Sequence, residues 1–141
     1  MSSCCDIRLA TRNNRYGAPI AKLGFPMAWH EAEVVRRAVG DTCARSILLE
    51  AASYTAPEML QNGFLTRMVE DASALQTECQ RTVERICQLG ATCARMNKQT
   101  LRALNNAAYT TEQQSAAYAY ADSAEHREGI TAFLEKRPPR F

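Results

Sequence analysis

The 141-residue chain contains no run of eighteen apolar residues, which is roughly the length that a helix needs to cross a bilayer. It also lacks a strong excess of charge of one sign, because 17 basic residues stand against 15 acidic residues, for a net charge of +2. Nucleic acids and anionic membranes are bound by strongly basic surfaces, so we expect neither as a partner. The N-terminus lacks a basic segment followed by an apolar stretch, and we therefore predict a cytoplasmic protein without a signal peptide.

The cysteines lack the spacing of a metal site or of a redox motif. None forms a CxxC pair, and none lies at a zinc-site spacing from His30 or His126. We predict no metal ion, and we expect reduced thiols that pack in the core as small apolar side chains. The six cysteines are Cys4, Cys5, Cys43, Cys79, Cys87 and Cys93.

The composition is that of an ordinary globular domain, with 46% hydrophobic and 23% charged residues. The local pattern changes near residue 70, because glycine and proline punctuate the chain before it and become scarce after it. We therefore predict an α/β protein that is mostly helical, with a mixed domain over residues 1–70 and a helical domain over residues 71–141.

Short strands and helices alternate in the first domain. Alternating apolar residues predict strands over residues 5–10 and 64–69. Helical periodicity begins at Ala28, and Gly40 is a natural residue to end that helix. Thr55 is a predicted N-cap of another short helix, because its hydroxyl can accept a hydrogen bond from the first helical turn.

Apolar residues of the second domain recur at helical spacing. Within the alanine- and tyrosine-rich residues 109–120, a third helix is predicted to start at Thr110 or Thr111. Asp122 with Glu125 three residues later fits a capping box before a last helix. The first two helices carry apolar stripes made of Ala72, Leu75, Cys79, Val83 and Ile86, and of Cys93, Met96, Leu101 and Leu104.

Three segments carry a recognisable pattern, in the right order and at similar separations. They are CDIRLA with YGAP and KLG at residues 5–24, the segment at residues 56–69, and SAEHREGITAFLEKRPPRF at residues 123–141. Together they resemble the enoyl-CoA hydratase/isomerase (crotonase) family. The last segment is the most specific, since it is similar to the C-terminal signature S-x-D-x-x-EG-x-x-AF-x-EKR-x-P-x-F of that family.

The resemblance implies a fold and an activity. Residues 1–70 would be the C-terminal part of a crotonase-type spiral of ββα turns, and residues 71–141 the helical trimerisation region that covers CoA. Family members bind acyl-CoA thioesters as substrates without a further cofactor, and two backbone N–H groups stabilise the enolate oxyanion. We expect an acyl-CoA partner, hydration or double-bond isomerisation as the reaction, and a trimer-based homo-oligomer.

Three features of the family do not match, and the first two concern its hydratase glutamates. Met1 falls just after the family's GGG-x-E loop, which holds one oxyanion donor and one hydratase glutamate, so we expect a truncated chain that is inactive alone. The second hydratase glutamate follows the proline that aligns with Pro19, and here Ile20 takes its place. Isoleucine transfers no proton, so a standard two-glutamate hydratase is excluded even for a longer parent protein.

A glycine-rich loop of the family aligns with residues 27–31, where Trp29 would fill space that glycine leaves open. His30 and Glu31, together with Glu33, are the acid/base candidates near this loop. One hypothesis makes His30 or Glu31 a catalytic replacement for the missing glutamate. The alternative places all three on a solvated first helical turn, where a glutamate is favourable beside the helix dipole.

The resemblance also assigns Pro19, Ile20 and Leu23 to the acyl-CoA pocket. Phe133 would line the acyl tunnel and Lys136 would meet a CoA phosphate. The two residues lie one helical turn apart, so both could face one pocket. The alternative is a core phenylalanine and a lysine that interacts with the helix C-terminus.

Two other interpretations stay open. The helical domain could be a non-catalytic oligomerisation module, recognised by a stable oligomer without affinity for CoA. A small helical binding protein outside the family is the other, and the density of matches at the C-terminus disfavours it. Residues 1–70 would leave strand edges and apolar faces uncovered, and we therefore expect self-association.

Overall fold

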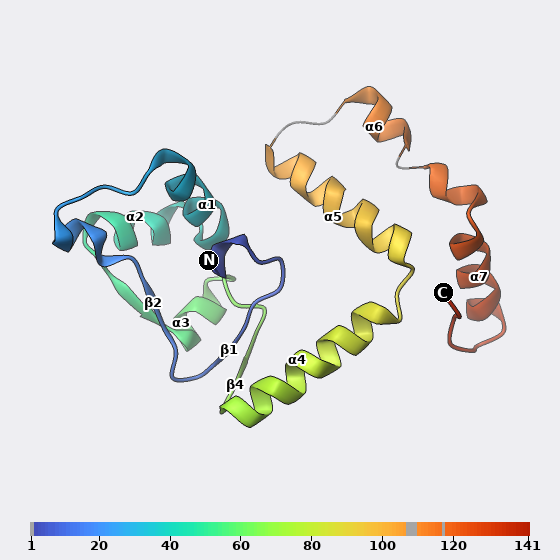
Figure 1. The fold of residues 1–141 in the computed structure, drawn as a ribbon, viewed down its shortest axis with the longest axis horizontal. Helices are drawn as coiled ribbons and strands as arrows, with labels where there is room; N and C mark the ends of the chain where they lie inside the picture. The colour runs from blue at the N-terminus through green and yellow to red at the C-terminus, as the bar shows by residue number, and fades with distance from the viewer. Residues whose placement is uncertain (1, 107–109, 117) are drawn as a thin grey trace. The chain divides into compact units, whose positions relative to one another are not determined.

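The computed structural model describes residues 2–106, 110–116 and 118–141 (Figure 1). The chain forms two units, Met1–Cys79 and Gln80–Phe141. The first combines short strands with helices, and the second is helical. The predicted division after residue 70 falls earlier than the observed one, because one helix, α4 (Ala72–Cys87), runs across the boundary. Within the described residues, no helix is both long and apolar enough to cross a membrane.

Strands of three residues form two separate pairs in the first unit (Figure 1). Strand β1 (Leu9–Thr11) is parallel to β4 (Arg67–Val69), and β2 (Arg15–Gly17) is antiparallel to β3 (Ser53–Thr55). The paired residues are Leu9 with Arg67, Ala10 with Met68, Thr11 with Val69, Arg15 with Thr55, Tyr16 with Tyr54 and Gly17 with Ser53.

Both predicted strand segments contain a strand, but each prediction is too long. In the segment 64–69 only the last three residues pair, because Phe64 and Leu65 turn into the core and are 2% and 4% exposed. In the segment 5–10 the strand begins late, because Arg8 reaches across to the Phe64 segment. Its guanidinium donates to the Phe64 carbonyl oxygen at 3.1 Å and lies 4.7 Å from the centre of the Phe64 ring.

The helices of the first unit begin and end where local chemistry predicts. Helix α1 (Trp29–Val39) ends at Gly40, whose φ of +82° lies in the region that favours glycine, and α2 (Asp41–Leu49) follows at once. Helix α3 (Ala56–Gln61) is capped by Thr55 as predicted. Two 3₁₀ turns, Ser2–Cys4 and Pro19–Leu23, complete the unit.

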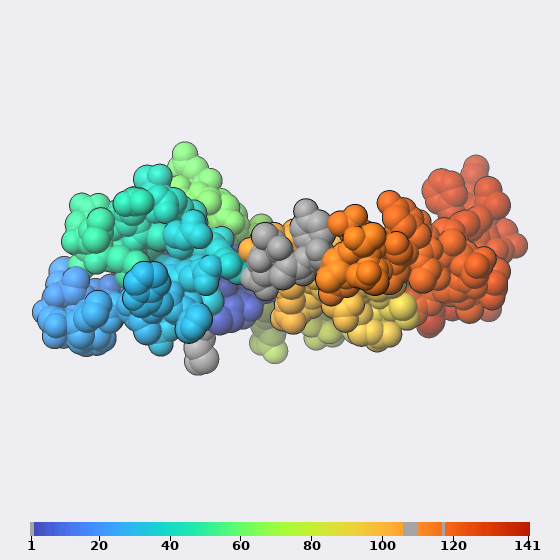
Figure 2. All heavy atoms as spheres, turned by 90° about the horizontal axis from the view of Figure 1, so that it is seen from above, coloured from blue at the N-terminus to red at the C-terminus, as the bar shows by residue number. Residues whose placement is uncertain are grey.

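A single core holds α1, α2 and α3 against the strands. Met59 is 1% exposed, and the rings of Tyr16 and Phe64 meet edge to face with their centroids 5.5 Å apart. Figure 2 shows the atoms of this unit, coloured blue to green, packed into one body. The buried cluster consists of Ala10, Val39, Cys43, Ala44, Ile47, Ala56, Met59, Phe64 and Leu65.

The second unit is helical, but its predicted apolar stripes are not buried. Helix α4 continues into it and is followed by α5 (Ala91–Asn106), α6 (Thr111–Ala116), a 3₁₀ turn (Ala119–Asp122) and α7 (Ala124–Leu134). The predicted helix start at Thr110 or Thr111 is confirmed, because α6 begins at Thr111, but α6 ends earlier than predicted; residues 109 and 117 lie outside the described residues. The exposed stripe residues are Val83 at 53%, Ile86 at 44%, Leu101 at 64% and Leu104 at 57%.

The capping box predicted at Asp122 is wrong. Ser123 is the N-cap of α7, and its hydroxyl accepts from the His126 N–H at 3.1 Å. Glu125 instead accepts from the backbone N–H groups of Thr92 at 3.1 Å and Cys93 at 3.4 Å, at the start of α5. Its carboxylate therefore caps a different helix from its own.

All six cysteines are free thiols, but the prediction that they pack in the core holds only in part. Cys43 is buried and Cys93 is half-buried. Cys79 and Cys87 are exposed, because the face of α4 that carries them has little cover within the described chain. The remaining two, Cys4 and Cys5, are exposed as well.

The cap of α3 gives a test of the first unit. Thr55→Ala removes the hydroxyl that accepts from the Glu58 N–H, and Thr55 loses its side of the capping box. We expect the free energy of unfolding to fall by about 1 kcal/mol in urea denaturation followed by circular dichroism. Thr100→Ala, on the exposed surface of α5, is the matched control and should change the free energy by less than about 0.5 kcal/mol. Equal effects of the two substitutions would contradict the cap.

Candidate functional site

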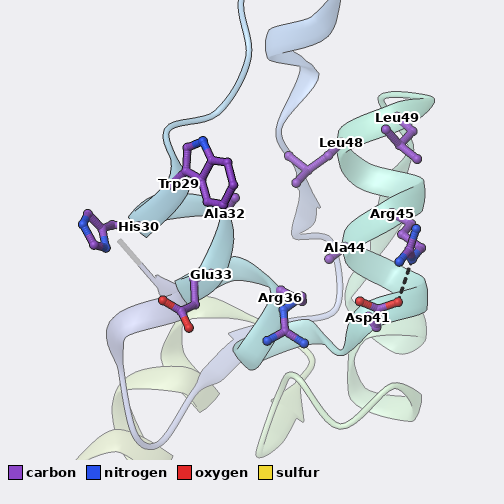
Figure 3. A pocket seen from close by; sticks show the side chains of 10 residues that line it. All are labelled: Trp29, His30, Ala32, Glu33, Arg36, Asp41, Ala44, Arg45, Leu48 and Leu49. Atoms are coloured by element: carbon purple, nitrogen blue, oxygen red, sulfur yellow. Dashed lines mark hydrogen bonds and ion pairs between the residues drawn. The ribbon is translucent and has the colours of Figure 1, made fainter. Parts of the chain in front are cut away.

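A cavity of about 530 Å³ lies between α1 and α2, and we call it the helix cavity (Figure 3). Small side chains, Ala32 on α1 and Ala44 on α2, hollow it out, and Trp29 and Leu48 stand on its two sides. Arg36 lies at one end of it, and the indole of Trp29 is 93% exposed. The volume falls within the range of small-molecule sites, and the lining is mainly apolar.

The acid/base candidates of the sequence lie at the start of α1. His30 lines the helix cavity by position, but Figure 3 shows its imidazole turned away from Trp29 and Ala32. Glu31 is exposed, and Glu33 is paired with Arg37 at 2.5 Å, one turn further along the helix. Across the described residues, no hydrogen bond joins His30 or Glu31 to another side chain. A catalytic role for either stays a prediction, and their exposure favours the solvated first turn.

The segment predicted to line the acyl-CoA pocket forms the 3₁₀ turn Pro19–Leu23. Gly24 ends it with a φ of +81°. Ile20 is half-buried, whereas Pro19 is exposed and Leu23 is 71% exposed. The turn therefore presents apolar side chains and no acid at the position of the missing glutamate.

A second cavity, of about 340 Å³, lies in the second unit, and we call it the tail cavity. The start of α5 and the face of α7 line it, with Phe133 on α7 and Phe141 from the chain's end among the lining residues. Phe133 is 82% exposed, so it is not the core phenylalanine of the alternative hypothesis.

Lys136 does not lie on the helix with Phe133. Helix α7 ends at Leu134, and Lys136 follows in a turn with a φ of +54°. The expected one-turn spacing along a helix is therefore wrong, although Lys136 remains close to Phe133 through a hydrogen bond from its N–H to the Phe133 carbonyl oxygen at 3.2 Å. Lys136 is exposed and is not among the residues that line the tail cavity.

A carboxylate on α7 holds the chain that follows the helix. The guanidinium of Arg137 donates to Glu128 at 2.7 and 3.1 Å, and the backbone N–H of Arg140 donates to the same carboxylate at 2.7 Å. These donors, Arg137 first, lower the pKa of Glu128 from 4.5 to about 2. Both residues fall in the C-terminal signature, but the pattern does not predict this contact, because the two residues lie nine positions apart with a helix end between them.

Residues 137–141 follow α7 and fold back on it, and we call them the returning chain. This segment places Phe141 against two glycines. A β-carbon at Gly129 would lie 3.9 Å from the Phe141 ring, and one at Gly90 would lie 3.7 Å from it. The mid-helix Gly129 is thus in contact with the returning chain, as its helix-disfavouring character suggests. At Gly90 the closer neighbour is the Glu125 carboxylate, 2.7 Å from such a β-carbon.

The site holds no obvious place for a metal ion. Over residues 2–106, 110–116 and 118–141, no three histidine, cysteine, aspartate or glutamate side chains gather to bind one. The helix cavity is mainly apolar and has Arg36 among its lining residues, a combination that suits an organic anion. The tail cavity is lined by apolar residues together with Glu125 and His126.

The sequence model of the enoyl-CoA hydratase/isomerase family matches residues 1–141. The chain belongs to this family. A probable enoyl-CoA hydratase of Mycobacterium tuberculosis is 30% identical over 100% of this chain and 56% of its own length. A putative enoyl-CoA hydratase of Thermus thermophilus is 32% identical, again over 100% of this chain and 56% of the relative.

Solved structures agree with the sequence relatives. An enoyl-CoA hydratase/carnithine racemase from Magnetospirillum magneticum has a TM-score of 0.91 and 32% identity, covering 99% of this chain and 52% of that one. The human enoyl-CoA hydratase domain-containing protein 3 has a TM-score of 0.85 and 27% identity, covering 99% and 56%. The fold is therefore a C-terminal part of the crotonase fold, and this enoyl-CoA hydratase/isomerase family chain spans about half the length of the relatives that it matches.

The two glycines of the tail cavity give a matched pair of tests. In this family member Gly90→Ala should push the Glu125 carboxylate away from the α5 N–H groups, and loss of this cap should lower the free energy of unfolding by about 1 kcal/mol. Gly129→Ala meets Phe141 at an ordinary contact distance of 3.9 Å and gains helix propensity, so it should be neutral or stabilise by up to about 1 kcal/mol. Urea unfolding followed by circular dichroism measures both, and equal effects would contradict the geometry.

The low pKa of Glu128 predicts a pH dependence of the returning chain. Because the folded pKa is depressed, the charged carboxylate stabilises the docked chain fully above about pH 4.5 and loses this effect as the pH falls toward about 2. Arg137 and Arg140 face the group, and Glu135 contacts Arg137 at 2.5 Å. NMR signals of the Phe141 ring and the Gly129 amide should change over this interval.

Glu128→Gln is the control for the pH titration, and it should lack this transition. Glu125 also has a lowered pKa, because the Thr92 N–H donates to it, and its titration at the start of α5 should be the same in both proteins. If the NMR signals of Phe141 and Gly129 in the wild-type protein change with a midpoint above about pH 5, the assignment to Glu128 is contradicted.

Proposed function

We propose that the chain binds an acyl-CoA thioester, and that the longer protein type to which it is related performs hydration or double-bond isomerisation through an oxyanion-stabilised enolate. The observation that carries the proposal is the family match over residues 1–141, which includes the segment with Phe133 and Lys136. The tail cavity, with Phe133 in its lining, and the exposed Lys136 three residues further along support it, because CoA thioesters combine an apolar acyl group with phosphates.

We further propose that these residues alone bind without turning over a substrate. The sequence has Ile20 where a hydratase has its second glutamate, and it contains no GGG-x-E segment to supply an oxyanion donor. His30 and Glu31 are the remaining acid/base candidates of the first unit, and both are exposed at the start of α1. Removing a preorganised oxyanion donor typically lowers kcat by about 10²- to 10³-fold, so activity would require groups outside these residues.

The exposed stripes favour a second function, which is assembly into a trimer-based homo-oligomer. Val83 and Ile86 on α4 and Leu101 and Leu104 on α5 are between 44% and 64% exposed, which is unusual for regularly spaced apolar side chains. Burial of such faces between copies would stabilise the helices by roughly 25 cal/mol per Å² of apolar surface. We also propose a cytoplasmic location, which rests on composition alone.

Isothermal titration with acetoacetyl-CoA tests the binding proposal. We expect saturable binding that weakens by about tenfold in Lys136→Ala, because a charge-assisted contact is lost, and by a similar factor in Phe133→Ala. Arg102→Ala removes one positive charge elsewhere in the same unit and is the control, with unchanged affinity expected.

Absence of binding by a folded chain would refute the acyl-CoA proposal and leave assembly as the function. Light scattering after size exclusion measures that alternative directly. A monomer that melts sharply and independently of concentration would contradict it.

A further inference from the structure

Lys136 sits in a backbone conformation that needs support. Its φ of +54° is in the left-handed region, which is unfavourable for a residue with a β-carbon. Lys136 takes this conformation at the end of α7, where its N–H donates to the Phe133 carbonyl oxygen at 3.2 Å and the Arg137 N–H donates to the Ala132 carbonyl oxygen at 3.0 Å, a pattern in which glycine is the usual residue. The Lys136 side chain is exposed, and no hydrogen bond or ion pair joins its ammonium to another described residue. The protein therefore keeps a lysine in a strained turn without an internal partner for its charge.

Glu128 supplies the support from outside the turn. It binds the next residue, Arg137, through two guanidinium N–H groups at 2.7 and 3.1 Å, and it accepts from the Arg140 N–H at 2.7 Å. The Arg137 N–H also donates to the Ala132 carbonyl oxygen at 3.0 Å. The backbone is thus tied to α7 at Arg137, the residue after Lys136. Because Arg137 contacts Glu128 through two N–H groups, the contact fixes both the position and the orientation of the Arg137 side chain.

The same contacts join the lysine to the tail cavity. Because Glu128 holds Arg140, the next residue, Phe141, lies over Gly129 and forms part of the wall of the cavity that Phe133 lines. One carboxylate therefore sets both an apolar recess and the turn that carries an unpaired ammonium. A ligand that suits this combination has an apolar part and a phosphate.

We propose that Glu128 is a positioning residue, which acts through Arg137 to aim Lys136 at a phosphate of the CoA thioester; the inference rests on the proposed acyl-CoA binding. Glu128 touches no ligand in this role. Its own charge would repel a phosphate, so its favourable effect on binding comes from the geometry that it imposes on the turn.

A positioning role and a purely electrostatic role of Glu128 predict opposite changes in ligand affinity. If Glu128 acts only through its charge, Glu128→Gln removes a repulsion and strengthens the binding of a polyanion. If it positions Lys136, the same substitution weakens binding by about tenfold, as loss of the lysine contact would. If Glu128 contributes only to stability, the effects of Glu128→Gln and Lys136→Ala on affinity should add in the double variant. If Glu128 acts through Lys136, the two effects should not add.

The experiment is a double-mutant cycle on the whole chain, with acetoacetyl-CoA as the probe and calorimetric affinity as the readout. Glu128→Gln and Lys136→Ala should each weaken binding by about tenfold, and the double variant should bind as Lys136→Ala alone does. Glu84→Gln, an equal charge change on α4 of the same unit, should leave the affinity unchanged. Arg137→Lys keeps the charge but loses the two-pronged contact, and should give an intermediate affinity; it replaces Glu128→Gln if that variant fails to fold.

Trypsin cleavage after Lys136 and Arg140 measures docking of the turn without any ligand, and it should be faster in Glu128→Gln. Unchanged or tighter binding in that variant overturns the positioning role while the acyl-CoA proposal stands, and so does an additive double variant. An unchanged protein that resists trypsin but does not bind acetoacetyl-CoA overturns the acyl-CoA proposal itself, and the positioning role with it.

Discussion

Two carboxylates on one face of α7 organise the second unit. Glu125 accepts from the first N–H groups of α5, and Glu128 accepts from Arg137 and from the N–H of Arg140. The described residues of this unit bury few side chains, among them Thr82 and Ala132, so polar contacts carry much of its organisation. Because both carboxylates act only when ionised, the caps, the returning chain and the tail cavity depend on the same charge state.

Burial of apolar side chains, rather than polar contacts, organises the first unit. A cluster around Met59 and Phe64 is buried and apolar, and it orients α1 and α2 with little help from ion pairs. Exposed helical pairs such as Arg45 with Asp41, at 2.6 Å, contribute little to stability because solvent screens them. Added salt should therefore lower the stability of the second unit more than that of the first, because it screens ionic contacts. Binding or assembly that covers the exposed stripes would stabilise the second unit more than the first.

Local chemistry could be predicted from the sequence, and contacts between distant residues could not. The Thr55 cap and the helix end at Gly40 depend on a few adjacent residues, and both are confirmed. The cap at Asp122 is wrong because Ser123 is also competent, and because Glu125 is engaged by α5. The long strand at 64–69 is wrong for a similar reason: alternation does not reveal that Phe64 packs against Tyr16 and Arg8.

The positions that depart from the family pattern are those expected to act in proton transfer, whereas those expected to bind the ligand match it. By the resemblance, Ile20 stands where a hydratase has a glutamate and Trp29 where the family has a glycine, whereas Phe133, Lys136, Glu128 and Arg137 match the C-terminal signature. Proton transfer requires an ionisable side chain at the reacting atom, so a single substitution abolishes it. The proposed binding would instead depend on an apolar recess, a charge and a supporting ion pair, none of which requires the catalytic group. If the proposed acyl-CoA binding holds, the residues of the second unit would bind the thioester without a group that transfers a proton.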